Sequence, residues 1–344
     1  MSVLPAIPSV SNGRVPTWRC AVIAALLSFG TVSIARAQDT AEGWLERLGG
    51  AAKSLSYEGT FVYRHEGRME TMRIIHRGEN EGEAERLITL TGAPREIIRD
   101  EQRVTCIFSD DRSVVVDQRQ LSKPFSSIVP GDVPRLSRTY QLELEGPGRI
   151  AGRPAQQILI KPRDRLRYGY RLWADRESGL LLRSDLLDEQ GEPIEQLMFT
   201  ELRTPASIPA AALQPQLSGE GFTWYRDPAQ PMDGSARKKP APRWQASDLP
   251  EGFELVTHEV RRIAGSAGPV EHMVYSDGLA SVSVYIEKGA GQSIFRGRSR
   301  MGAVHAFGRV VNDEQITVVG EVPAATVARI GASLQPVAAL NSAR

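Results

Sequence analysis

The chain is poor in the residues on which most site chemistry depends. Its 344 residues include two cysteines and five histidines, and its 42 Lys and Arg almost balance its 41 Asp and Glu. So balanced a charge argues against a nucleic-acid partner, because phosphate neutralisation needs a concentrated basic surface. Two cysteines are too few for a fold held by several disulfides. With 41% hydrophobic residues the chain still has enough apolar material for globular cores, and its length is typical of two domains.

Long hydrophobic runs are also scarce. One apolar run, residues 20–34, lies near the N-terminus and is short for a membrane span. Arg14 and Arg19 precede it, and Ala35-Arg36-Ala37 follows it with the small-x-small pattern of a cleavage site. We predict that residues 1–37 are a secretory signal peptide, cut after Ala37 to release an exported, soluble protein. The alternative is an uncleaved anchor helix.

The histidines lack the spacing of a metal site. His65-Glu66 and His258-Glu259 begin like the zinc-protease motif, but the positions four residues after the histidines hold Met69 and Arg262. No serine lies in a nucleophile motif, and no glycine-rich phosphate loop follows a strand. We therefore predict a protein that is not an enzyme, with no catalytic residue, metal or cofactor. A carboxylate pair of the glycosidase kind among the acids of residues 175–195 is the alternative.

A change of hydrophobic period divides the rest of the chain. Apolar residues recur at helical spacing between Asp39 and Leu55, and from residue 57 the period is 2. About eleven short strand-like runs follow, separated by turn-prone pairs such as Glu66-Gly67. Consecutive strands without alternating helices predict the α+β class, with a large curled antiparallel sheet covered by the leading helix and by the Pro-rich loop 123–138. The runs are 57–65, 69–77, 86–91, 95–99, 104–108, 113–116, 142–150, 156–160, 167–174, 180–187 and 194–202.

Composition divides the chain into an N-terminal domain, a linker and a second domain. We assign residues 38–203 to the N-terminal sheet domain. Residues 204–247 are rich in proline and contain the basic triplet Arg237-Lys238-Lys239, which predicts an interdomain linker, part ordered and part mobile. Residues 248–344 predict a smaller α+β domain. Its expected elements are strands at 253–261, 270–276, 279–287 and 315–319 and a helix at 323–330.

A curled sheet can bind a ligand on its concave face without any catalytic residue. If the sheet does not close, every second residue of each strand lines a trough there. The alternative is that the leading helix and the Pro-rich loop fill this trough as an ordinary core. The ligand-binding candidates on this face are Phe61, Tyr63, Ile74, Tyr170, Leu172, Leu182 and Met198.

Several segments resemble the MucB/RseB family of periplasmic negative regulators of an envelope-stress sigma factor. Residues 173–196, Trp-Ala-Asp-Arg-Glu-Ser-Gly through Pro-Ile-Glu-Gln, are similar to the signature hairpin of that family. Gly92-Ala-Pro-Arg-Glu-Ile-Ile98 resembles another of its motifs. In the second domain, Leu249–Phe253, Tyr275–Leu279 and Ile316–Pro323 resemble family segments in the same order. The Pro-rich loop and the linker match only loosely.

The resemblance implies a fold and a function that composition alone does not. It implies a half-barrel similar to lipoprotein carriers, followed by a partner-binding C-terminal domain. It also implies that the partner is the periplasmic part of a membrane-spanning anti-sigma factor, shielded from proteolysis and released by a lipid or lipopolysaccharide signal. The half-barrel taken alone suggests a periplasmic carrier or chaperone for lipoproteins or lipids instead. Whether the chain forms a homo-oligomer is left open.

Four residues of the second domain are our candidates for partner contact. They are Phe253, Tyr275, Arg298 and Arg300, which lie at or beside family-like positions. Aromatic residues and arginine dominate the binding energy of protein interfaces. The alternative is that the two aromatic residues belong to the core and that the two arginines are solvated.

Overall fold

A computed structural model describes residues 40–78, 80, 82–117, 132–226, 241–262, 266, 268–288 and 295–337. The predicted signal peptide, most of the Pro-rich loop and the basic triplet lie outside the described residues. Among the described residues, no helix is both long and apolar enough to cross a membrane.

Twelve strands form one large N-terminal sheet with the order β12-β6-β5-β4-β3-β2-β1-β11-β10-β9-β8-β7. Every neighbouring pair is antiparallel except β12 with β6, which is parallel. The first strand of the chain thus lies in the middle, between β2 and β11. The predicted large antiparallel sheet is confirmed. The strands are β1 Tyr57–His65, β2 Arg68–Arg77, β3 Ala84–Thr89, β4 Arg95–Arg99, β5 Val104–Phe108, β6 Ser113–Asp117, β7 Tyr140–Ile150, β8 Arg153–Pro162, β9 Gly169–Asp175, β10 Leu181–Leu187, β11 Pro193–Arg203 and β12 Thr223–Arg226.

The turn predicted at Glu66-Gly67 joins β1 to β2. His65 pairs with Arg68, so the connection is two residues long. Both turn residues have positive φ, 50° at Glu66 and 73° at Gly67. Such a turn matches the right-handed twist of the strands, which keeps this hairpin in register.

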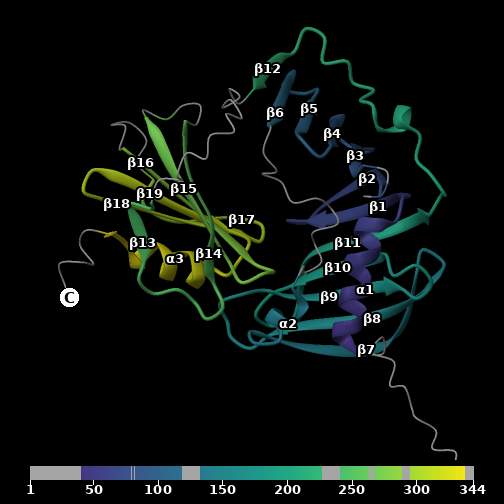
Figure 1. The fold of residues 1–344 in the computed structure, drawn as a ribbon, viewed down its shortest axis with the longest axis horizontal. Coiled ribbons are helices and arrows are strands. Elements are labelled where there is room, and N and C mark those ends of the chain that lie inside the picture. Colours follow the sequence, from purple (N-terminus) through teal and green to yellow (C-terminus); the bar gives the residue numbers. More distant parts are fainter. Residues whose placement is uncertain are drawn as a thin grey trace, which may run out of the picture. The chain divides into compact units, whose positions relative to one another are not determined.

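Helix α1, Ala41–Ser54, covers one face of this sheet (Figure 1). The hydroxyl of Thr40 caps its first turn by accepting a hydrogen bond from the backbone N–H of Gly43 at 3.1 Å. Leu45 and Leu48 are fully buried against strand residues such as Leu172. Full burial of a leucine side chain contributes roughly 2 kcal/mol, so this apolar stripe holds the helix on the sheet. Helix α2, Val133–Leu136, adds Val133 and Leu136 to the same cluster.

The first half of the predicted linker packs on the N-terminal sheet. A 3₁₀ turn, η4 Ala210–Leu213, places Leu213 against Ile75 of β2. The buried carboxylate of Glu96 accepts hydrogen bonds from the backbone N–H groups of Gln216 and Leu217. The chain then adds β12 to the edge of the sheet. Proline content predicted a linker because proline disfavours helices, but it does not prevent an extended chain from lying on a sheet.

A second sheet follows, with the order β14-β15-β16-β19-β18-β17, covered on one face by α3. A two-stranded pair, β13 with β20, closes the end of its core. The predicted smaller α+β unit is confirmed, with four strands, β13, β17, β18 and β20, that the sequence did not indicate. The elements are β13 Trp244–Ala246, β14 Glu254–Arg262, β15 Pro269–Ser276, β16 Ser281–Lys288, β17 Gly297–Met301, β18 Val304–Val311, β19 Glu314–Gly320, α3 Ala324–Ser333 and β20 Leu334–Pro336.

His272 of β15 makes the stability of the second sheet depend on pH. Its ring is buried and stacks on Tyr285 at 4.5 Å between centroids. Burial lowers the pKa of His272 below its ordinary value, even though Glu259, 3.4 Å away, partly opposes that shift. Below about pH 6.5 the unfolded chain therefore binds a proton that the folded chain does not. Folding stability must fall as the pH drops through this window.

We expect His272→Phe, which keeps a ring against Tyr285, to flatten this pH dependence. The free energy of unfolding of the wild type and of the variant, measured in urea at about pH 7.5 and about pH 5, gives the comparison. If both proteins lose the same stability on acidification, His272 is not the titrating group.

Candidate functional site

Four of the ligand-binding candidates belong to the core beneath α1. Phe61, Ile74 and Leu182 pack in one cluster that includes Ala51 of the helix, and Leu172 packs against Trp44, Leu45 and Leu48. None of the four is more than 2% exposed. In this structure the helix therefore fills the concave face at these positions, which is the alternative that the sequence left open.

The two candidate tyrosines lie at a more polar part of the same face. The hydroxyl of Tyr63 donates a hydrogen bond to Glu195, and the hydroxyl of Tyr170 donates one to Glu321 at 3.4 Å. Burial raises the pKa of both tyrosines above the ordinary value, and the neighbouring glutamates raise it further. Both hydroxyls therefore stay protonated and act as donors.

Met198 lies on the opposite face, so its placement in the trough was wrong. It is 38% exposed and pairs with Val62 and Arg183, whereas its neighbours Leu197 and Phe199 are buried. Three apolar residues in a row leave the alternation of a strand ambiguous, so periodicity does not decide which of the three faces the trough.

The four partner-contact candidates divide into two buried and two exposed residues. Tyr275 is 2% exposed in the core of the second sheet, and Phe253 is 6% exposed. Arg298 and Arg300 are exposed on β17, the edge strand of that sheet. The guanidinium of Arg300 donates to the carbonyl of Gly302 at 2.8 Å. Only the two arginines are therefore available for direct contact in this structure.

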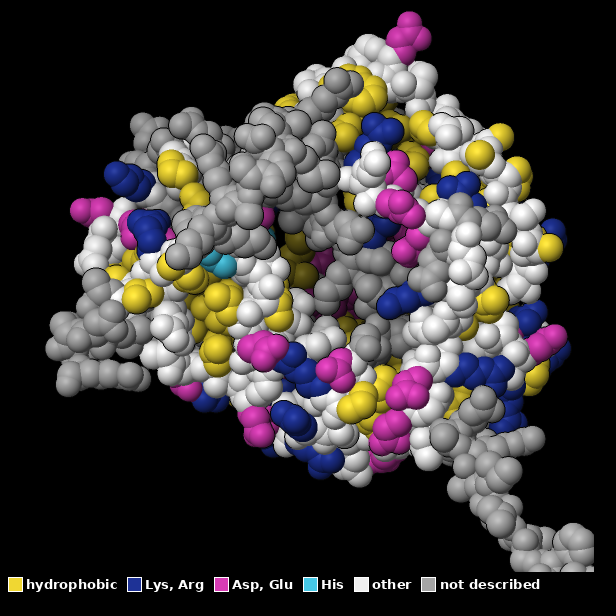
Figure 2. All heavy atoms as spheres, viewed as in Figure 1, with side chains coloured by type: hydrophobic (Ala, Val, Ile, Leu, Met, Phe, Trp, Pro, Cys, Tyr) yellow, Lys and Arg dark blue, Asp and Glu magenta, His cyan; other side chains and the backbone are white. Residues whose placement is uncertain are grey.

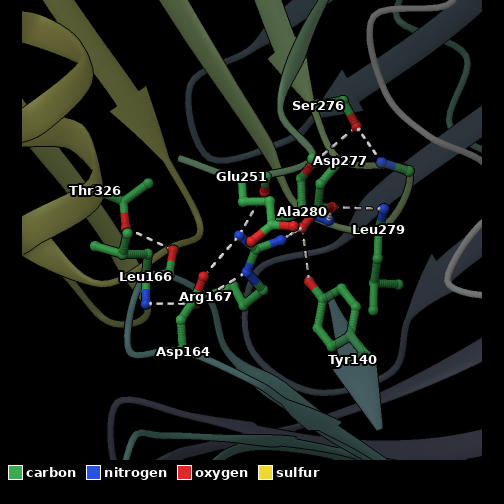
Figure 3. Close-up of polar contacts among 12 residues, drawn as sticks. Tyr140, Asp164, Leu166, Arg167, Glu251, Ser276, Asp277, Leu279, Ala280 and Thr326 are labelled. Carbon is green, nitrogen blue, oxygen red and sulfur yellow. Dashed lines mark hydrogen bonds and ion pairs between the residues drawn. The ribbon is translucent and has the colours of Figure 1, made fainter. Parts of the chain in front are cut away.

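A buried carboxylate, Asp277, lies in the turn between β15 and β16. Its Oδ1 accepts hydrogen bonds from the backbone N–H groups of Leu279 and Ala280, at 2.9 and 2.8 Å. Gly278, between Asp277 and Leu279, has a φ of 101°, which only glycine adopts readily. The other oxygen of Asp277, Oδ2, accepts hydrogen bonds from Arg167 Nη1 at 2.6 Å and from the Tyr140 hydroxyl at 3.0 Å (Figure 3). The turn of the second sheet is thus bound by two residues of the first.

Arg167, just before β9, has no exposed side-chain surface. Its Nε and Nη2 donate to the Asp164 carboxylate at 3.1 and 2.9 Å, and Nη2 also donates to the carbonyl of Glu251 at 2.8 Å. Its guanidinium lies 5.3 Å from the ring centre of Phe253. Burial alone would lower the pKa of Arg167, but the Asp164 hydrogen bonds and the charge of Asp277 raise it above the ordinary value. The cation is therefore fully paired.

Further contacts surround this ion pair, and most of them are polar. Arg135 of α2 donates to Glu254 at 2.5 Å and to the carbonyl of Gly252 at 3.0 Å. The hydroxyl of Thr326, at the start of α3, donates to the carbonyl of Leu166 at 2.5 Å (Figure 3). A cavity of about 140 Å³ lies beside them. It is lined by Arg135, Arg138, Thr139, Gly252, Phe253, Glu254 and Asp277.

Two small apolar contacts also belong to this junction. Leu279 packs with the cluster of α1 and α2, and Ala303 packs with Tyr168 and Leu186. Asp277 and Arg167 are held by several hydrogen bonds each. The arrangement fixes the position of one sheet's turns against the other sheet, and it has the chemistry of a structural interface.

Arg167, Asp277 and Tyr140 were not among the residues predicted from the sequence to form a site. The signal that could have found them is that Leu249–Phe253 and Tyr275–Leu279 both resemble family segments. Both segments border the junction, so their family-like character coincides with contacts between the two sheets.

The profile of the MucB/RseB N-terminal domain matches residues 40–217, and that of the MucB/RseB C-terminal domain matches residues 238–335. This protein therefore belongs to the MucB/RseB family, whose curated members are sigma-factor regulatory proteins. The sigma factor AlgU regulatory protein MucB of Pseudomonas aeruginosa is 36% identical over 321 residues, which cover 91% of this chain and 97% of that protein. The sigma-E factor regulatory protein RseB of Escherichia coli K12 is 28% identical, over 85% of this chain and 89% of its own.

Solved structures agree with the sequence comparisons. The crystal structure of MucB in complex with MucA(peri) matches with a TM-score of 0.65 and 33% identity, covering 86% of this chain and 98% of that chain. The crystal structure of MucB matches with a TM-score of 0.62 and 31% identity over the same shares. The fold is thus that of MucB across both sheets.

Aspartate substitutions separate core from surface among the ligand candidates. We expect Leu172→Asp to lose about 4 kcal/mol or more of folding stability, because a carboxylate would be buried among apolar side chains without a partner. Met198→Asp, on the exposed face, should change stability by less than about 0.5 kcal/mol. Urea unfolding followed by circular dichroism measures both. A stable Leu172→Asp protein would place Leu172 in an accessible trough.

Proposed function

We propose that this protein is a periplasmic negative regulator of an envelope-stress sigma factor. It would bind the periplasmic part of a membrane-spanning anti-sigma factor and shield that segment from proteolysis. The observation that carries the proposal is the match to MucB in complex with MucA(peri), which spans almost all of the solved chain. The 36% identity to a sigma factor regulatory protein supports the same function.

The proposal includes the absence of catalysis. It is supported by membership of a family of regulatory proteins. Within the described residues, no group of three or more His, Cys, Asp or Glu side chains is placed to hold a metal ion. On the face that Figure 2 shows, basic and acidic side chains are interspersed, which agrees with a protein partner better than with nucleic acid.

A lipid or lipopolysaccharide signal that releases the partner is also part of the proposal. Because α1 covers Leu172 and Leu182, an acyl chain would reach them only by displacing the helix or Leu279. This filled concave face favours a regulator, in which ligand entry changes the structure, over a carrier, which needs an open trough.

Arg298 and Arg300 remain our candidates for direct contact with the anti-sigma factor. Both are exposed on an edge strand, next to Met301, which is 71% exposed. Phe253 and Tyr275 are buried, so we now assign them an indirect role. An exposed edge with arginine and a large apolar side chain has the composition of an interface centre.

We expect the full mature chain to bind the periplasmic part of the anti-sigma factor, and the double variant Arg298→Glu/Arg300→Glu to bind at least tenfold more weakly. Isothermal titration calorimetry measures both. Arg149→Glu is the matched control, because Arg149 is also exposed and donates to the carbonyl of a hairpin glycine, Gly152. No binding by the wild type would contradict the proposed function, whereas equal losses in both variants would contradict only the contact residues.

Export is tested separately. We propose that residues 1–37 direct the chain to the periplasm and are removed after Ala37. Mass spectrometry of the protein from a periplasmic extract should then find an N-terminus at Gln38. An intact N-terminal segment in the membrane fraction would instead indicate an anchor helix.

A further inference from the structure

On each side of the junction described above, part of the polar contacts is local to that side. On one side, Asp277 Oδ1 closes its own turn with the N–H groups of Leu279 and Ala280. On the other side, Asp164 holds Arg167 from within the same loop and also accepts from the N–H of Leu166. Separating the sheets would break the bonds to Asp277 Oδ2, together with those from Arg167 to the Glu251 carbonyl, from Arg135 to Glu254 and Gly252 and from Thr326 to Leu166, but it would leave both local arrangements intact. Neither side has to unfold for the junction to open.

The balance of polar and apolar contacts also suits reversible opening. When a buried ion pair opens, both charges are hydrated again, and this hydration free energy offsets much of the lost Coulomb attraction. Opening the pair therefore costs far less than the attraction alone suggests. The apolar part of the junction is small, with Leu279 and Ala303 as its buried members from the second sheet. Interfaces of this polar kind within one chain are typical of domains that move relative to each other.

The junction also sets where the predicted partner-binding edge lies. Gly302 and Ala303 form the turn between β17 and β18, and Ala303 is 1% exposed against Tyr168 and Leu186 of the N-terminal domain. Docking of the second sheet therefore holds this end of β17 beside the first. A partner that contacts both sheets would bind the docked arrangement more tightly than the open one.

We propose that the Asp277 carboxylate, together with the Arg167 guanidinium and the Tyr140 hydroxyl, forms a reversible latch that positions β17 for the anti-sigma factor. This inference rests on the proposed function for its partner, but the latch itself is a property of this chain alone. Arg167, Asp277 and Tyr140 are positioning residues, because they act through the placement of β17 and need not touch the partner. Opening of the latch then lowers the affinity for the partner, and bound partner favours the closed latch.

The variant Asp277→Asn tests the latch without removing the turn. Asparagine Oδ1 can still accept from Leu279 and Ala280, but its amide presents a donor to the donors of Arg167 and Tyr140. Asp175→Asn is the matched control. Asp175 is also a fully buried aspartate, at the end of β9, and accepts from Arg153 at 2.7 Å, but that pair lies within one sheet.

The distance between the two domains is a suitable measurement, because a general loss of folding stability does not change it in the folded protein. Spin labels at Glu46→Cys on α1 and Gln335→Cys on β20, both exposed positions, report it by pulsed electron resonance in a Cys106→Ser background. We expect Asp277→Asn to broaden the distance distribution toward longer values with unchanged circular dichroism, and to weaken partner binding at least tenfold. Asp175→Asn should lower the melting temperature while leaving distance and affinity as in the wild type.

Several results would overturn the latch. One is a folded Asp277→Asn protein with the wild-type distance distribution, and another is an equal shift in Asp175→Asn. If Asp277→Asn does not fold, Tyr140→Phe, which removes one donor to Oδ2 and keeps the ring, replaces it and must shift the distribution in the same direction. A wild type that binds no anti-sigma factor contradicts the proposed function, whereas the distance measurement still decides the latch.

Discussion

The curled twelve-stranded sheet has one face of apolar side chains that must be kept from water, and much of the structure follows from how that face is covered. Helix α1 lays Leu45 and Leu48 on it, and the short helix α2 adds Leu136. The second sheet contributes Leu279 from its β15–β16 turn to the same cluster. The core of the first domain is therefore completed by a residue of the second, and the two sheets are linked through a shared apolar cluster.

Inserting Leu279 has an electrostatic consequence. It brings the neighbouring Asp277 into a place without exposed surface, where an unpaired carboxylate would be very costly. The cost is offset by donors on both sides: the turn's own N–H groups on Oδ1, and Arg167 with Tyr140 on Oδ2. The junction is thus polar because a turn, the one between β15 and β16, covers part of the apolar face. That turn places its polar backbone groups and its capping residue, Asp277, in the junction.

The sequence predicted those features that depend on local periodicity. The strands, α1 with its buried stripe and the Glu66-Gly67 turn follow from alternation, helical spacing and turn chemistry within a few residues. Features that depend on distant pairs were missed. Arg167 stood at the start of a predicted strand, with nothing local to indicate that Asp277, 110 residues later, would receive its charge. Likewise, Phe253 and Tyr275 were interpreted as partner contacts because their segments resemble the family, whereas the structure buries Phe253 against Arg167 and Tyr275 in the core of the second sheet.

The way in which the concave face is covered also makes this fold suitable for regulation. A carrier must offer its trough to a cargo, but here the concave face is occupied by α1, and the buried charges of the junction satisfy one another. The contact between the two sheets remains adjustable. It is mostly polar, its apolar part is small, and each side keeps its local structure when the contact opens. An apolar ligand that competed with Leu279 for the cluster under α1 would act on this contact directly. Binding at the first sheet would then change the position of an edge strand in the second, which is the coupling that a ligand-released regulator requires.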